Sequence, residues 1–138
     1  MSRNNPTLNT KVVMAQSPDA WTAAADTSAD IACLGFTHAI VILQAGTLGT
    51  SATLDCVVKG TGTAGATHAA ITGAAFTQLV KATDDDTSAF GVVDLVGNGL
   101  VEISTTMTVG AATSDAACTV VLCNLDDTAR AGTADFSV

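Results

Sequence analysis

Short apolar or alternating runs, each closed by a connector rich in glycine, threonine, serine or aspartate, recur along most of the chain. The runs cover residues 8–15, 38–46, 52–60, 67–80, 89–97, 100–110 and 117–125. Short runs at this spacing, without a sustained helical period, are typical of antiparallel β-sandwiches and barrels. We therefore expect an all-β fold: an antiparallel β-sandwich, jelly-roll-like, with little helix.

Two segments carry more specific local signals. Residues 96–100 read VGNGL, and the Asn-Gly pair favours a two-residue type I′ turn, which predicts that strands 89–96 and 100–109 are neighbours in one sheet. The segment 17–30 is the one helix candidate, because Ser17 could cap a helix that has Pro18 at its first position. Its apolar stripe is short, so we expect at most a short surface helix or an ordered loop.

The chain of 138 residues is long enough for one domain and too short for a second core. We expect an N-terminal arm with the first strand, residues 1–16, followed by a single β-sandwich domain, residues 17–138. No run reaches about 18 consecutive apolar residues, and the N-terminus lacks the apolar core of a secretory signal. We therefore expect no membrane partner and assembly in a cytoplasm.

The charge balance argues against nucleic acid as a partner. The net charge is −8 with only five lysines and arginines, whereas phosphate contacts need clustered basic side chains. Charged residues make up 13% of the chain and hydrophobic residues 48%, so the surface consists largely of small, uncharged side chains. Such a surface loses little side-chain entropy when a partner covers it, which favours contact with other protein subunits.

The four cysteines, Cys33, Cys56, Cys118 and Cys123, lack the CxxC spacing of a zinc site. Cys118 and Cys123 are five residues apart in one predicted strand. They should therefore face opposite sides of the sheet and cannot share a metal ion. We expect four buried, free thiols.

The chain contains no recognisable catalytic motif. The two histidines, His38 and His68, have no hydrolase motif around them, and we interpret both as ordinary strand-edge residues. The glycine-rich stretches 46–51 and 60–67 lack the Lys-Ser/Thr pair of a phosphate loop. We therefore predict no catalytic residue, no cofactor and no enzymatic activity.

Asp84, Asp85 and Asp86 stand in a row between two apolar runs. Three consecutive carboxylates point in different directions, so at most two could bind one ion, and the spacing of a calcium loop is missing. We interpret the segment as the polar tip of a hairpin, in which each aspartate is dispensable for folding. The alternatives are a weak divalent-ion site at these aspartates and a contact with a basic partner. We interpret Asp126-Asp127 in the same way.

Several segments between residues 38 and 125 match a known arrangement of strands and turns. They are Ile71-x-Gly73-Ala74-x-Phe76, the acidic turn at 84–86, Val93-Asp94-Leu95 and the run at 100–103. In this order the chain resembles small β-sandwich structural proteins of tailed bacteriophages and prophages. The resemblance implies a capsid decoration or cement protein that stabilises the phage head, is located in the virion and is assembled in the host cytoplasm.

The resemblance also implies partners. They are the major capsid protein and further copies of the chain, as a homotrimer, because decoration proteins commonly sit on three-fold positions of the capsid lattice. A neck, tail or fibre structural protein is one alternative. A carbohydrate- or receptor-binding module is another, although aromatic residues are only 4% of the chain.

Overall fold

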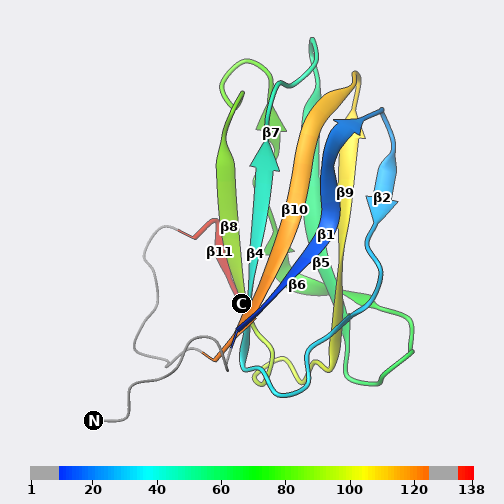
Figure 1. The fold of residues 1–138 in the computed structure, drawn as a ribbon, viewed down its shortest axis with the longest axis vertical. Helices are drawn as coiled ribbons and strands as arrows, with labels where there is room; N and C mark the ends of the chain where they lie inside the picture. Colours follow the sequence, from blue (N-terminus) through cyan, green and yellow to red (C-terminus); the bar gives the residue numbers. More distant parts are fainter. Residues whose placement is uncertain (1–9, 125–133) are drawn as a thin grey trace.

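The computed structural model describes residues 10–124 and 134–138, which form eleven β-strands and no helix (Figure 1). The strands are β1 (Thr10–Trp21), β2 (Ala25–Thr27), β3 (Ile31–Ala32), β4 (His38–Ala45), β5 (Thr53–Thr61), β6 (Ala69–Ala75), β7 (Leu79–Val80), β8 (Ser88–Asp94), β9 (Glu102–Gly110), β10 (Ser114–Cys123) and β11 (Phe136–Ser137). They make two sheets that face each other (Figure 1). The predicted all-β fold is confirmed.

The strand order identifies the sandwich as a jelly roll. One sheet, called here the five-stranded sheet, has the order β1-β10-β4-β8-β11. The other, the six-stranded sheet, has the order β2-β9-β5-β6, with β3 beside β9 and β7 beside β5. The rows β1-β10-β4-β8 and β2-β9-β5-β6 correspond to the two four-stranded sheets of an eight-stranded jelly roll. β11 adds a short parallel strand beside β8.

The core forms because alternate residues of each strand point between the sheets. In β4 the inward residues are Val41 and Leu43, and in β5 they are Leu54, Cys56 and Val58, all at most 1% exposed. One polar pair lies inside the sandwich between β1 and β9. The Thr105 hydroxyl donates to Gln16 Oε1 at 2.7 Å, and Gln16 Nε2 donates to the Thr105 carbonyl at 3.1 Å.

The predicted helix at 17–30 is wrong. Its first part belongs to β1, where Asp19 pairs with Ala116 and Trp21 with Ser114 of β10. Pro18 is tolerated there because β1 is an edge strand and the pairing is irregular between Gln16 and Asp19. Pairing with a neighbouring strand therefore outweighs the local helix signals.

The predicted hairpin at 96–100 is also wrong. The chain does turn there, and Leu100 N donates to the Leu95 carbonyl at 2.8 Å. However, β8 lies in the five-stranded sheet and β9 in the six-stranded sheet. The flanks show why: Leu95 N bonds the Thr37 carbonyl, whereas Val101 N bonds the Thr61 carbonyl of the opposite sheet. The turn connects the sheets and does not join two neighbouring strands.

The ends of the described chain are held in different ways. β1 runs without a break across residue 16, where the expected boundary between arm and sandwich domain lies; that boundary stays a prediction. At the other end, the Phe136 ring lies directly over Gly91, where any Cβ atom would overlap it. Phe136 also meets Phe76 edge-on, with ring centroids 5.0 Å apart.

No helix in the described ranges is long and apolar enough to cross a membrane.

Candidate functional site

The acidic segment 84–86 is a connector between two sheets. It follows β7 of the six-stranded sheet and precedes β8 of the five-stranded sheet, so it is not the tip of a hairpin as predicted. Asp84 Oδ2 accepts a hydrogen bond from Val80 N at 2.8 Å, and Asp85 Oδ1 accepts one from Leu48 N at 2.9 Å. Asp86 has a φ of 54°, a left-handed conformation that aspartate tolerates.

These contacts give the carboxylates of Asp84 and Asp85 separate roles. Asp84 closes the turn after β7, and Asp85 holds the neighbouring connector, residues 46–52, through Leu48. Lys81 Nζ binds the other oxygen of Asp85. The hydrogen bond from Lys81, followed by that from Leu48 N, lowers the pKa of Asp85 below its ordinary value of 3.8. Within the described ranges, the three aspartates do not form a set of metal ligands. Asp126-Asp127 lies outside the described residues.

The four cysteines are all buried and free. Cys118 of β10 lies in the core and shares a hydrogen bond with Cys56 of the opposite sheet. That hydrogen bond and burial raise the pKa of Cys56, and burial raises the pKa of Cys33 to about 11. The thiols of Cys33 and Cys56 are therefore protonated at neutral pH, whereas the shared hydrogen bond lowers the pKa of Cys118.

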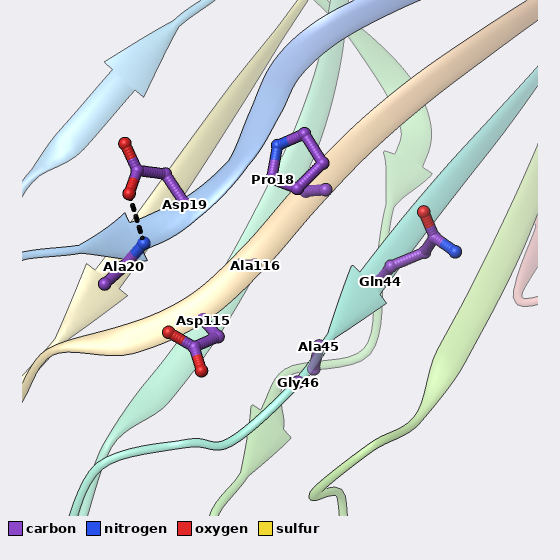
Figure 2. A pocket seen from close by; sticks show the side chains of 9 residues that line it. Pro18, Asp19, Ala20, Gln44, Ala45, Gly46, Asp115 and Ala116 are labelled. Atoms are coloured by element: carbon purple, nitrogen blue, oxygen red, sulfur yellow. Dashed lines mark hydrogen bonds between the residues drawn. The ribbon is translucent and has the colours of Figure 1, made fainter.

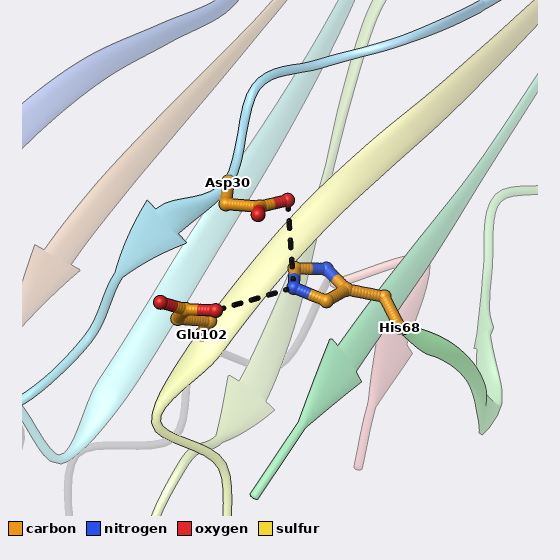
Figure 3. A group of neighbouring side chains, drawn as sticks. All are labelled: Asp30, His68 and Glu102. Carbon is orange, nitrogen blue, oxygen red and sulfur yellow. Dashed lines mark ion pairs between the residues drawn. The ribbon is translucent and has the colours of Figure 1, made fainter. Parts of the chain in front are cut away.

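The two histidines differ in their surroundings. His38 begins β4, is buried, and bonds the hydroxyl of its neighbour Thr37 through Nδ1 at 2.8 Å. His68 lies just before β6 and comes together with Asp30, which precedes β3, and Glu102, which begins β9 (Figure 3). The interpretation of His68 as an ordinary strand-edge residue did not anticipate this cluster.

The geometry of the His68 cluster is well defined. His68 Nε2 lies 3.5 Å from Asp30 Oδ1 and 3.6 Å from Glu102 Oε2, as the dashed lines in Figure 3 show. On the other side of the ring, His68 Nδ1 is 2.8 Å from Ser104 Oγ. Glu102 Oε2 also accepts a hydrogen bond from Gly65 N at 2.9 Å. The His68 side chain is only 7% exposed, that of Glu102 17%, and that of Asp30 61%.

A second feature is the outer face of the five-stranded sheet. The register places Val12, Val121, Ile40 and Val92 side by side across β1, β10, β4 and β8. The next outward row contains Met14, Thr119, Ile42 and Phe90. Seven of these eight side chains are apolar, and Val12 and Met14 are 66% and 61% exposed. The outer face of an antiparallel sheet that meets only water is normally polar, so this face is unusual.

The outer face of the six-stranded sheet has the opposite character. Thr27 lies beside Thr106, and the next pair along β9 and β5 is Ser104 with Lys59. The hydroxyls of Thr27 and Thr106 bond each other at 2.9 Å. The two outer faces therefore differ: the first is almost wholly apolar, whereas the second carries threonine, serine and lysine side chains beside Val57.

An open hollow adjoins the apolar face where β1, β10 and β4 approach the same end of the sandwich (Figure 2). Its lining includes the small residues Ala45, Gly46 and Ala116 and the acidic residues Asp19 and Asp115. Asp19 Oδ1 accepts a hydrogen bond from Ala20 N at 2.8 Å, as drawn in Figure 2. The residues that line the hollow include no cluster of catalytic side chains.

The architecture defines a jelly-roll β-sandwich, a fold used by viral capsid and lectin domains. The sequence matches no protein-family model and no curated protein sequence. Among solved structures, the SPBc2 prophage-derived protein YomS is similar with a TM-score of 0.53 at 10% identity, over 83% of this chain and 92% of YomS.

Two virus structures are similar to the same degree. The infectious bursal disease virus VP2 subviral particle has a TM-score of 0.54 at 12% identity, over 83% of this chain and 32% of that chain. The infectious bursal disease virus Gx strain gives 0.55 at 12% identity, over 91% and 35%. The chain thus spans about a third of these viral chains. At such identities the likeness is one of fold.

Proposed function

We propose that this chain is a non-enzymatic structural protein of a phage virion, of the capsid decoration or cement type. The jelly-roll fold carries the proposal, because its structure is similar to a prophage-derived protein over nearly all of that protein's length and to part of the chain of a viral subviral particle. The acidic charge and the scarcity of basic residues agree with a role that does not touch packaged nucleic acid.

The apolar outer face of the five-stranded sheet is the surface proposed to contact the partners. Its two rows of aliphatic and aromatic side chains would be buried against the major capsid protein or against further copies in a homotrimer. Few charged side chains lie in these rows, so hydrophobic burial would stabilise the contact. Attachment to particles should therefore change little between low and high salt.

The test uses particles of the virus that encodes the chain. Particles depleted of the protein would be incubated with the purified chain, and binding would be measured by co-sedimentation and located by cryo-electron microscopy. The expected result is regular density on the head at a copy number that follows the capsid lattice. Density confined to the neck, tail or fibre would move the protein to that structural class, and absence from the particle would overturn the proposal.

A matched pair of variants tests the surface. Val12→Asp places a charge in the apolar face, and Val96→Asp places the same charge in the connector between β8 and β9. The two valines are 66% and 69% exposed, so neither substitution should unfold the chain. Val12→Asp should abolish binding to particles while Val96→Asp retains it. Equal binding by both variants would show that another surface makes the contact.

A further inference from the structure

We propose that Asp30, His68 and Glu102 bind one divalent transition-metal ion of the zinc type. Their ligand atoms lie within 4.8 Å of one another. His68 Nε2 is 3.5 Å from Asp30 Oδ1 and 3.6 Å from Glu102 Oε2. A tetrahedral ion bound at about 2.1 Å separates its ligand atoms by roughly 3.4 Å. Both distances from the imidazole therefore already correspond to a tetrahedral site.

The imidazole lacks a hydrogen-bond partner on the side that faces the carboxylates. His68 Nε2 is buried and, within the described part of the chain, makes no hydrogen bond. Its other nitrogen is 2.8 Å from the hydroxyl of Ser104, which is itself 2% exposed. When Nδ1–H donates to Ser104, the Nε2 lone pair points at two carboxylates. A cation between these three groups removes the repulsion between the Nε2 lone pair and the two carboxylates. The Ser104 contact fixes the tautomer that a metal requires.

The supporting contacts leave the carboxylates able to coordinate. Glu102 is oriented by Gly65 N, which bonds Oε2 at 2.9 Å. Asp30, at 61% exposure, has the freedom to close the remaining distance to Glu102. Two carboxylates neutralise a divalent charge, and one imidazole favours zinc-type ions over calcium or magnesium. The fourth position faces an open pocket lined by Thr27, Lys59 and Thr67, where water can complete the coordination.

The site would join three segments that are far apart in the sequence. Asp30 lies between β2 and β3, His68 ends the connector between β5 and β6, and Glu102 begins β9. A bound ion would therefore fasten two connectors to the polar outer face of the six-stranded sheet. This inference is independent of the virion role, because it concerns the opposite face of the sandwich.

The experiment titrates Zn²⁺ into the full chain, without an affinity tag and after removal of metals with EDTA. Calorimetry should give one ion per chain, and the ion should raise Tm, because it binds the folded state alone. Asp30→Asn should weaken binding at least about tenfold. Since Asp30 is exposed, this variant keeps its fold, and Asp115→Asn, an exposed aspartate of β10, is its control with unchanged affinity.

Co²⁺ provides the second measurement. A tetrahedral nitrogen and oxygen site should give intense visible absorption without a thiolate charge-transfer band, and His68→Gln should remove the absorption. A thiolate band would assign the metal to the buried cysteines and overturn the proposal. So would the absence of Zn²⁺ binding, or binding that Asp30→Asn leaves unchanged, because His68 would then be satisfied by a proton instead of a metal ion.

Discussion

Asp85 is the one aspartate of the segment 84–86 whose side chain joins this connector to the connector at 46–52. Its carboxylate accepts from Leu48 N at 2.9 Å and binds Lys81. The sequence suggested that each of the three aspartates is dispensable for folding, but these contacts argue otherwise for Asp85. We expect Asp85→Ala to lower Tm at neutral pH, because Leu48 N and Lys81 both lose their partner. Asp86→Asn should leave Tm nearly unchanged, since asparagine also tolerates the φ of 54°.

The effect of Asp85→Ala should depend on pH. The pKa of Asp85 is lowered in the folded chain, so the ionised carboxylate favours folding. Its contribution is present above the ordinary value of 3.8 and is lost as the pH falls through the lower folded value. The difference in Tm between the parent chain and Asp85→Ala, followed by thermal unfolding, should therefore vanish in acid. A difference that persists there would mean that the carboxylate charge is not involved.

For single residues, the sequence indicates on which face of a strand a side chain lies better than it indicates which other side chains it contacts. Because Ile103 and Met107 of the run at 100–110 are buried in the core, its alternation puts Glu102 and Ser104 on the outer face. It did not show that His68 covers them, because the contact joins residues at least 34 positions apart. Glu102 is the one glutamate of the chain, but that fact carries no information about its neighbours.

The short strand β11 packs closely against β8. Phe136 lies over Gly91, and an added Cβ would overlap its ring. We expect Phe136→Ala to lower the free energy of unfolding by about 3–5 kcal/mol and Gly91→Ala by about 1–3 kcal/mol. In the double variant the methyl group introduced by Gly91→Ala would occupy space left by the ring. The double variant should therefore lose less stability than the two single losses together.

Denaturant unfolding of the four proteins in this mutant cycle measures the coupling. Strict additivity of the two losses would show that Gly91 and Phe136 do not share a packing site.

Strands could be predicted from the sequence where one buried face produces an alternating pattern. They could not be predicted where the structure depends on pairing with a distant strand. The alternation in β5 and β9 follows from one face pointing into the core. The Asn-Gly turn at 96–100 is a local signal, yet its flanks bond to Thr37 and Thr61 in different sheets. Likewise, the alanines and Pro18 of the segment 17–30 favour a helix locally, but β10 is available as a partner for β1.

The molecule as a whole should protect its thiols. All four cysteines are buried, and burial raises the pKa of Cys33 to about 11 and also raises that of Cys123. Because thiolates are the reactive form, we expect almost no reaction with a thiol reagent at mildly alkaline pH in the native chain. Denaturation without reductant should release four reactive thiols. Rapid reaction of the native chain would contradict the burial, and fewer than four thiols would indicate a disulfide.

The jelly roll itself could be predicted because the spacing of strand-like runs reflects one buried face in each sheet. The chemical difference between the two outer faces was harder to predict. The continuous apolar run at 38–46 carried part of the signal, since Ile40 and Ile42 interrupt the alternation expected of a half-exposed strand. That Val12 and Val92 extend the same row depends on strand order, which no single run encodes.

The pairing of β1 with β10 also bears on how the chain is made. Thr10 lies opposite Cys123, so the first described strand is paired with a strand made more than a hundred residues later. At a synthesis rate of about 5–20 residues per second, that interval is on the order of 5–20 seconds. Pairings between such distant segments also form slowly. The strand β1 therefore remains without its partner while the residues between it and β10 are made, and this edge of the sandwich closes only after β10 has left the ribosome.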